Sequence, residues 1–321
     1  MRKQSLSVVL PTYNCAPLMA RHLDSMDAWA DLADEILVVD SRSTDGTLEL
    51  IRNRLRHPNI RIIERDRGLY ESWNEGIATT KGHWIYLSTA GDTIERAHLL
   101  KLMEAGAKAN ADVVISPCRF VDATGRPLPG TTKGNPHIMR GFGGETFVVE
   151  PPDVRDHVAM GAGIQGLLGS CASDLFRGDF LRNRPFPANY GTHGDSAWML
   201  RHAHEIRLCV VPEIGSTFCR HVKHRLEDPS DLDDIYNRIY VTEIRHGGPF
   251  PGLTLSLGIR SLRSRRKRYA REDFPLKGFL ASLAGTLLRG LLAAAQAPRK
   301  LNFLRSIKKL PSGVMTNRFT K

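Results

Sequence analysis

The 321-residue sequence predicts an α/β fold of the kind with a mostly parallel central sheet flanked by helices. Short apolar, β-branched runs alternate with amphipathic stretches through the first third of the chain, which is the pattern of a parallel sheet covered on both faces. Polar and acidic residues follow these apolar runs directly, and ligands of open α/β sheets bind beyond the carboxyl ends of the strands. The hydrophobic share of 41% suffices for a buried core.

The predicted elements follow one another in a regular order. Strands are expected at residues 6–10, 36–39, 60–63, 84–87 and 112–116, and helices at residues 16–29, 47–55, 70–79 and 97–109. Residues 122–156 are rich in glycine and proline, which predicts a long irregular excursion. Helical patterns resume at residues 173–181, 195–204 and 232–245. These elements predict one domain over residues 1–250.

The positive charge of the chain is concentrated at its C-terminal end. The net charge is +11, but residues 258–321 hold 16 Lys or Arg against two acids, or +14, which leaves 29 bases and 32 acids, or −3, for residues 1–257. A basic body would indicate a nucleic-acid surface, whereas a basic tail on an acidic body indicates anionic lipid. We therefore expect no nucleic-acid partner.

Residues 251–321 are predicted to form a basic amphipathic helical tail. Between residues 276 and 297 apolar side chains fall on one helical face, and Arg289 in mid-segment favours a helix lying in the membrane interface over one that spans it. A helix packed on the body is the alternative. The first residues make a poor secretion signal, and the five cysteines lack CxxC spacing, which indicates reduced thiols. We expect a cytoplasmic protein, at the inner face of the membrane if the tail binds lipid.

The first two predicted strands end in polar residues. The segment Pro11-Thr12-Tyr13-Asn14 closes the first strand and by itself is an ordinary strand exit. The second strand delivers Asp40 and Ser41 to the sheet edge, where a carboxylate can accept hydrogen bonds from ribose hydroxyls or a base N–H. Asp45 stands in an Asp-Gly turn and is interpreted as a turn and helix-cap residue.

The next two predicted strands also lead to acids. Asp66 and Gly68 precede a helix that carries Tyr70 and Asn74, and alone this segment is a helix with a glycine at its start. The fourth strand leads to Asp92. One carboxylate can bind a hard cation such as Mg²⁺ or Mn²⁺ when diphosphate and water complete the shell, and capping of the following helix is the open alternative.

In this order the four segments resemble the inverting family 2 glycosyltransferases of the GT-A fold. Members open with a strand ending in P-T-Y-N, as at residues 11–14, followed by V-V-D-x-x-S-x-D-G-T, as at 38–47, and D-x-G-x-Y-x-x-x-N-x-G, as at 66–76. The resemblance extends over roughly residues 5–120, and more loosely over 165–225. It implies a nucleotide-sugar site formed by Pro11, Thr12, Tyr13, Asn14, Asp40, Ser41, Asp66, Gly68, Tyr70, Asn74, Ala90 and Gly91.

The resemblance also implies a divalent cation, Mn²⁺ or Mg²⁺, as cofactor. Asp92 would ligate it, with His221 as a late ligand. Thr89 and Gly91 stand where acids are frequent in the family, as in its N-x-G-D subgroup with Thr89 in place of Asn, so Asp92 is the single acid of its segment. Arg220 or Lys223 would contact the diphosphate.

The second half of the domain is expected to supply a general base. Residues 194–201 are similar to the E-D-x-x-x-x-x-R segment of the family, with Gly194 in place of the first acid. This resemblance implies Asp195 as the base, and a helix cap is the alternative reading of an Asp that opens a helix. Residues 163–166 are expected to contribute acceptor contacts.

Taken together, the resemblance implies inverting, metal-dependent transfer of a sugar in bacterial polysaccharide or glycolipid synthesis. The favoured donor is a UDP-sugar and the acceptor a saccharide or a lipid-linked sugar. Residues 1–120 would form the nucleotide-binding half and residues 121–250 the acceptor-binding half. A nucleotide-sugar-binding protein without activity is the alternative. An oxidoreductase would need a glycine-rich turn after the first strand, and residues 11–17 contain no glycine. The G-x-S-x-G elbow of Ser-His-Asp hydrolases is absent.

Overall fold

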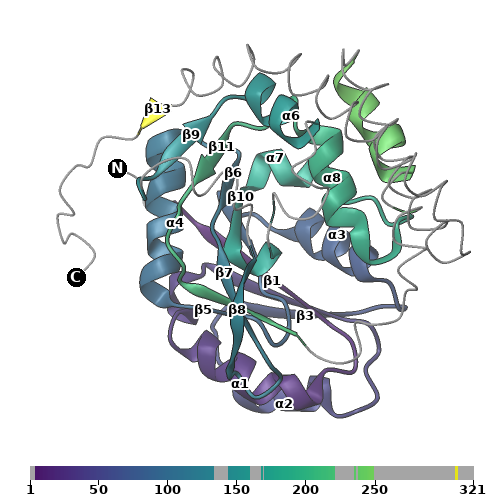
Figure 1. Ribbon diagram of the computed structural model, residues 1–321. Helices are drawn as coiled ribbons and strands as arrows, with labels where there is room; N and C mark the ends of the chain where they lie inside the picture. Colours follow the sequence, from purple (N-terminus) through teal and green to yellow (C-terminus); the bar gives the residue numbers. More distant parts are fainter. Residues whose placement is uncertain are drawn as a thin grey trace, which may run out of the picture.

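A computed structural model describes residues 4–133, 144–159, 168, 170–220, 235, 238–248 and 308–309. Within these residues a large sheet lies between two layers of helices (Figure 1). His221, Lys223, residues 163–166 and most of the predicted tail lie outside the described ranges.

Nine described strands form the large sheet, in the order β13-β9-β11-β6-β10-β4-β1-β2-β3. The strands are β1 (Leu6–Thr12), β2 (Glu35–Asp40), β3 (Ile60–Glu64), β4 (Trp84–Leu87), β6 (Val113–Ile115), β9 (Phe147–Val149), β10 (Asp174–Arg177), β11 (Leu208–Val210) and β13 (Lys308–Lys309). The block β4-β1-β2-β3 is parallel throughout, whereas β10 is antiparallel to β4 and β6, and β9 is antiparallel to β11. The predicted α/β class is confirmed, and besides this block β11 pairs parallel with β6.

A smaller sheet joins distant segments near Asp92. Its order is β5-β12-β7-β8, with β5 (Thr93–Ile94), β12 (Ser216–Cys219), β7 (Cys118–Val121) and β8 (Pro127–Lys133). Strand β5 directly follows Asp92 and pairs antiparallel with β12. The residues after Asp92 are therefore hydrogen-bonded to β12, a strand of the second half.

Helices cover both faces of the large sheet. Its two cores are separated by the sheet, since Val8 and Leu10 of β1 pack on one side and Val9 on the other, as the two-residue period of a strand requires. The first core includes α1 (Ala16–Asp27), α2 (Thr47–Arg54) and α4 (Arg96–Ala109). The second includes α3 (Leu69–Thr79), α6 (Pro151–Ala159), α7 (Gly178–Arg182) and α8 (Gly194–His202). Short 3-10 turns are η1 (Ala30–Leu32), η2 (Cys171–Ser173), η3 (Gly191–His193) and η5 (Ile244–Gly247).

Two expectations from the sequence are wrong in the second half. The region predicted as an irregular excursion contains β8, β9 and α6, and the predicted helix at 173–181 begins as strand β10. Strand β10 is inserted between β4 and β6 and has two apolar residues, Leu175 and Phe176, between Asp174 and Arg177, too few for periodicity to distinguish a strand from a helix. Its antiparallel partners come from distant parts of the chain.

The predicted tail touches the body at one described point. Lys308 and Lys309 form β13, which pairs with β9 at the edge of the large sheet. Among the residues that the structure describes, no helix is both long and apolar enough to cross a lipid bilayer.

Candidate active site

The predicted acids lie beyond the carboxyl ends of three neighbouring parallel strands. Thr12 pairs with Asp40 at the ends of β1 and β2, and Asp40 pairs with Glu64 at the end of β3. Asp66 follows β3, and Asp92 follows β4 on the other side of β1. Because parallel strands end at the same edge, the three aspartates that the sequence singles out share one edge of the sheet.

Asp40 is a buried support of this edge. Its side chain has no exposed surface. Oδ1 accepts hydrogen bonds from Thr12 Oγ1 and Ser43 Oγ, both at 2.7 Å, and Oδ2 accepts from Ser43 N at 2.7 Å. These bonds join the end of β1 to the loop after β2, so Asp40 fixes the shape of this part of the edge.

The loops after β1 and β2 are bonded to each other. Asn14 N donates to Ser43 Oγ at 3.0 Å, and Asn14 Oδ1 accepts from Thr44 N at 2.8 Å. Asn14 and Arg42 both adopt the left-handed backbone conformation, with φ of 43° and 52°. This conformation is uncommon outside glycine, and the bonds between the loops hold it in place.

Asp45 serves two helices at once. Its Oδ2 accepts from Ala16 N at the start of α1, at 3.0 Å, and its Oδ1 accepts from Thr47 N and Thr47 Oγ1 at the start of α2. Burial raises the pKa of Asp45, but these hydrogen bonds outweigh it, and the pKa lies below its ordinary value. The geometry agrees with the interpretation of Asp45 as a cap residue.

An exposed rim lies on this support, and we define it as Tyr13, Arg42, Asp66 and Arg67. Arg42 Nη1 lies 2.9 Å from Asp66 Oδ1, with side chains 69% and 81% exposed. The Arg67 guanidinium lies 4.6 Å from the centroid of the Tyr13 ring, which is 41% exposed. Arg42 and Arg67 are not among the site residues that the sequence predicts. Each is an arginine at a variable position of a matched motif, and that position is the sequence feature that could have indicated it.

Asp92 is held by donors from three separate segments. Oδ2 accepts from Thr89 Oγ1 at 2.8 Å and from Ser170 Oγ at 3.0 Å, and Oδ1 accepts from Cys219 N at 2.8 Å. The residue is 5% exposed. Glu95, not Asp92, precedes the first residue of α4, so the helix-cap alternative is not what the structure shows.

Helix α1 supports the loop that carries Asp92. His22 Nδ1 lies 2.8 Å from Asp92 O, and a carbonyl only accepts, so Nδ1 carries the proton and Nε2 accepts from Ser88 Oγ at 3.1 Å. Burial lowers the pKa of His22 to about 4. Gly91 has φ of 91°, and an added Cβ would lie 3.1 Å from Leu18 Cδ1, so the loop needs glycine there.

The part of the chain that the structure describes contains no cluster of three His, Cys, Asp or Glu side chains suited to a metal ion. The polar set at Asp92 is one carboxylate with the hydroxyls of Thr89 and Ser170. All of these are oxygen ligands, the type that Mg²⁺ and Mn²⁺ prefer. The residues therefore fit a hard cation in chemistry, with one protein carboxylate to hold it.

Asp195 lies in the first turn of α8, partly exposed. Its neighbourhood includes Tyr70, whose hydroxyl donates to Thr192 O at 3.0 Å. Tyr70 is in the first turn of α3, and α3 starts at the carboxyl end of β3. Asp195 is thereby brought to the same edge of the sheet as Asp40, Asp66 and Asp92. The α8 N-cap is His193, so Asp195 is not the cap of its own helix.

The other end of α8 is anchored by an ion pair whose acid, Glu243, is buried. Arg201 Nε lies 2.6 Å from Glu243 Oε2, and Tyr190 donates its hydroxyl to Glu243 Oε1 at 2.5 Å. Burial raises the pKa of Glu243, but the hydrogen bonds from Arg201 and Tyr190 outweigh it and bring it below its ordinary value. Arg201, the arginine of the matched segment, therefore has a structural partner.

Several residues expected among the nucleotide contacts have their polar atoms engaged elsewhere. Asn74 uses both its amide atoms on the backbone of Phe186, at 2.8 Å each. Ser41 Oγ lies 3.0 Å from Ser72 Oγ, and Tyr70 is bonded to Thr192 O. Three more are backbone or packing positions along the edge: Pro11, which is buried, Gly68, which precedes α3, and Ala90, which is half-buried. These residues form the framework of the edge.

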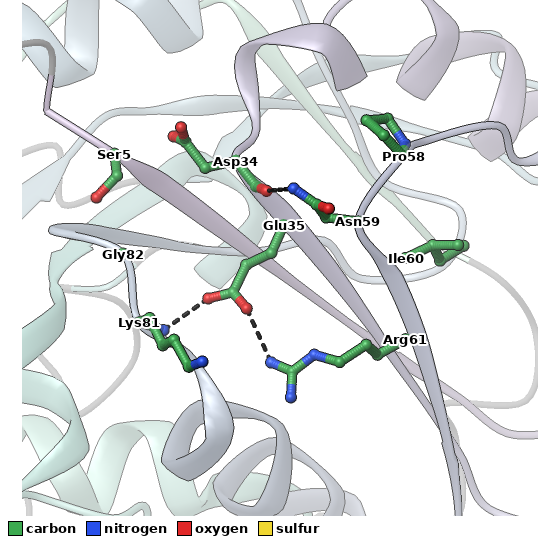
Figure 2. Close-up of a pocket in the computed structure, with 9 residues that line it drawn as sticks. All are labelled: Ser5, Asp34, Glu35, Pro58, Asn59, Ile60, Arg61, Lys81 and Gly82. Carbon is green, nitrogen blue, oxygen red and sulfur yellow. Dashed lines mark hydrogen bonds and ion pairs between the residues drawn. The ribbon is translucent and has the colours of Figure 1, made fainter.

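A hollow of about 580 Å³ lies at the opposite edge of the sheet. Residues at the starts of β1, β2 and β3 line it, and Figure 2 shows Glu35 bonded to Lys81 and Arg61 within it. Burial raises the pKa of Glu35, but hydrogen bonds from Ser7, Lys81 N and Arg61 bring it below its ordinary value. Its polar groups satisfy one another, and the hollow contains none of the predicted site residues.

Comparison with known proteins identifies a related family. Residues 7–165 match the family described as Glycosyl transferase family 2. Succinoglycan biosynthesis protein ExoO of Rhizobium meliloti is 30% identical over 125 residues, or 38% of this chain and 36% of that protein. Poly(ribitol-phosphate) beta-glucosyltransferase of Bacillus spizizenii is 26% identical over 139 residues, or 41% and 22%. The chain thus matches less than half the length of these curated relatives.

Solved structures agree on the fold. S. aureus TarS 1–349 in complex with UDP-GlcNAc superposes with a TM-score of 0.59 at 18% identity, over 93% of this chain and 89% of that one. Mannosyltransferase PcManGT from Pyrobaculum calidifontis, in complex with GDP-Man and Mn²⁺, gives 0.51 at 20% identity, over 94% and 81%. With the matched motifs at one sheet edge, these comparisons assign residues 7–165 to glycosyl transferase family 2 and show the GT-A type of fold for the chain.

Proposed function

We propose that the protein transfers a sugar from a nucleotide-diphosphate sugar to an acceptor hydroxyl with inversion at the anomeric carbon. The observation that carries the proposal is the convergence of Asp40, Asp66, Asp92 and Asp195 on one edge of the sheet. Relatives named for succinoglycan, poly(ribitol-phosphate) and PGL/p-HBAD biosynthesis favour a product in polysaccharide or glycolipid synthesis. Residues 1–120 would serve the donor, residues 121–250 the acceptor, and residues 251–321 would be a separate tail.

The exposed rim is the proposed nucleotide contact. Tyr13 offers an aromatic face for a base, Asp66 an acceptor for N–H or ribose hydroxyl groups, and Arg42 and Arg67 charged donors for phosphate. Pro11, Thr12, Asn14, Asp40, Ser41, Gly68, Tyr70, Asn74, Ala90 and Gly91 would act as the framework of this site. Neighbours crystallised with UDP and UDP-GlcNAc favour a UDP-sugar, and one with GDP-Man keeps a GDP-sugar open.

Asp195 is the proposed general base. Its carboxylate would take the proton from the acceptor hydroxyl as the oxygen attacks the anomeric carbon, while the bond to the diphosphate breaks and the diphosphate leaves with the electron pair. A single displacement of this kind inverts the anomeric carbon. A base of this type contributes typically about 10²–10⁴-fold to the rate.

A divalent cation is the proposed cofactor, and the Mn²⁺ of a structural neighbour supports it. Asp92, with the hydroxyls of Thr89 and Ser170, would hold the ion, and His221 remains a proposed further ligand. The ion would neutralise charge on the diphosphate. Because Cys219 N already bonds to Oδ1 of Asp92, we expect weak binding of the ion until the diphosphate adds its oxygens.

Contact with the inner membrane face through residues 251–321 is also proposed. The support is the +14 charge of residues 258–321 against −3 for the rest. Sedimentation with vesicles of phosphatidylcholine, with and without phosphatidylserine, tests it. Salt-sensitive binding that depends on the anionic lipid is expected, and no binding to either vesicle contradicts it.

Thermal shift against UDP-, GDP- and dTDP-sugars, with and without Mn²⁺, identifies the donor. Asp195→Asn is then compared with the wild type for donor turnover and for UDP affinity. Turnover should fall by about 10²–10⁴-fold with UDP affinity retained. Retained turnover in Asp195→Asn would show that the base lies elsewhere. Stabilisation by a donor with no turnover under any condition would favour the alternative, a nucleotide-sugar-binding protein.

A further inference from the structure

Helix α3 contacts the segment that leads to Asp195 through two side chains of the D-x-G-x-Y-x-x-x-N-x-G motif. The Tyr70 hydroxyl donates to Thr192 O at 3.0 Å, three residues before Asp195. Asn74 Nδ2 donates to Phe186 O, and Asn74 Oδ1 accepts from Phe186 N, both at 2.8 Å. The two side chains thus bond to both ends of residues 186–192.

The Tyr70 ring is also a surface on which the backbone before Asp195 rests. It is 2% exposed and stacks on Phe186 with ring centroids 5.7 Å apart and an interplanar angle of 26°. A Cβ added to Gly194 would lie 2.6 Å from two ring carbons of Tyr70 and 2.3 Å from Pro187 O. Gly194, which stands where the family often has an acid, is therefore in direct contact with Tyr70.

The state of the Tyr70 hydroxyl suits this contact. Burial raises the pKa of Tyr70 well above its ordinary value, and the negative charge of Asp195 raises it further. The hydroxyl therefore keeps its proton at neutral pH, as the bond that it donates to Thr192 O requires.

We propose that Tyr70 and Asn74 are positioning residues that set the place of the Asp195 carboxylate relative to the donor. The proposal rests on the proposed function, in which Asp195 is the base. A base acts only within hydrogen-bond reach of its proton, and a displacement of about 1 Å can cost roughly 10²-fold. The motif that follows Asp66 at the nucleotide edge therefore also fixes the residue that acts on the acceptor.

Tyr70→Phe is the main test because it keeps the ring and removes the hydroxyl, with its bond to Thr192 O and its interaction with Asp195. Tyr86→Phe is the matched control, since Tyr86 is 1% exposed and its hydroxyl also donates to a backbone carbonyl, Ala172 O, at 2.9 Å. Three quantities are measured in each variant: kcat and donor KM for UDP release from UDP-glucose and UDP-GlcNAc, the Kd of UDP by calorimetry, and hydrogen exchange across residues 186–196.

In Tyr70→Phe we expect kcat to fall about tenfold or more, with donor KM and UDP Kd within about twofold of the wild type. Exchange across 186–196 should rise in Tyr70→Phe and stay unchanged in Tyr86→Phe, whose kcat should remain within about twofold. Gly194→Ala, which pushes against the same ring, should reproduce the kcat loss with UDP Kd unchanged. Equal kcat in the two tyrosine variants, or unchanged exchange across 186–196, would overturn the proposal.

Asp195→Asn in the same assay separates this proposal from the proposed function. If Asp195→Asn turns over like the wild type, the assignment of the base fails. If Asp195→Asn is inactive while Tyr70→Phe is fully active, the base stands and the positioning role fails. If the wild type releases UDP from neither donor, the exchange across 186–196 still decides whether Tyr70 holds this segment.

Discussion

The two halves of the molecule hold their acids in different ways. In the first half, Asp40 and Asp45 bond to loops of adjacent parallel strands, 28 and 29 residues away in sequence. In the second half, the segment before Asp195 is held by Tyr70 and Asn74, which are 122 and 112 residues from their partners. The first half thus builds its edge around Asp40 from neighbouring loops, whereas Asp92 and the segment before Asp195 are held by contacts across the fold. Changes near Asp40 should remain local, and changes at Tyr70 or Asn74 should spread to Asp195.

Removing Glu243 should give the largest loss of stability. In Glu243→Ala, Arg201 loses its ion pair and Tyr190 its acceptor, and breaking a buried pair costs about 3–5 kcal/mol. Because the Arg201 side chain is 30% exposed, we expect a loss near 3 kcal/mol, at about the lower end of that range, and urea unfolding measures it. Glu64→Ala is the control in the first half, since it breaks an exposed pair with Arg52. Equal losses in both variants would contradict the contrast between the halves.

Acid should weaken the contact between the two halves that runs from His98 through Ser116 to Ser173. Its Nε2 lies 2.9 Å from Ser116 Oγ, which donates to Ser173 O, and burial lowers the pKa of His98 to about 4. Protonation therefore favours the unfolded chain. The stability that neutral His98 contributes is fully present above about pH 6.5 and is lost as the pH falls towards 4. Below about pH 4 the loss is complete and no longer grows.

Protonation linked to His98 should lower the free energy of unfolding by about 3 kcal/mol between pH 7 and pH 4. Urea unfolding of wild type and His98→Gln at several pH values measures it. We expect a flatter pH dependence in the variant, while His22, which is buried in the same way, continues to contribute to both proteins. Parallel curves for the two proteins would remove His98 as a cause.

Gly76→Ala tests how closely α3 must lie on the parallel strands. The added Cβ would lie 2.5 Å from Val9 Cγ1 and 3.0 Å from Val39 Cγ2. We expect a loss of about 2 kcal/mol from overpacking, although alanine is the better helix former by about 1 kcal/mol. Thermal unfolding measures it. A stabilised variant would show that α3 can shift freely on the sheet.

Arg42→Ala should have the smallest effect on stability. Its pair with Asp66 is exposed, and such pairs contribute at most about 1 kcal/mol, so we expect a change below about 0.5 kcal/mol. The proposed nucleotide contact predicts a measurable loss of UDP affinity in the same variant, read by calorimetry. A large loss of stability would instead place Arg42 in the buried support.

Much of the first half is predictable from sequence because its information is local. Each strand, its polar end and the following helix occupy one continuous stretch, so the edge that gathers Asp40, Asp66 and Asp92 follows from chain order alone. The residue types do not reveal exposure. Asp40 is fully buried, whereas Asp66 is 81% exposed, although both follow a strand. That difference comes from Thr12 and Ser43, which enclose one carboxylate and not the other.

The second half is less predictable because its elements depend on distant partners. Strand β10 becomes a strand only by insertion between β4 and β6, and the same short run alone also fits a helix. The partners of Asn74 and Tyr70 lie more than a hundred residues away, so the motif suggests ligand contacts where the fold uses structural ones. No local pattern indicates such a contact.

The short strand β13 has a consequence for handling the protein. It pairs through Lys308 and Lys309 with β9, whose residues Phe147, Val148 and Val149 are buried. An uncovered apolar edge strand is a template for self-association. A version of the protein shortened before residue 308 would expose that template, and we expect it to form aggregates that the 321-residue chain avoids.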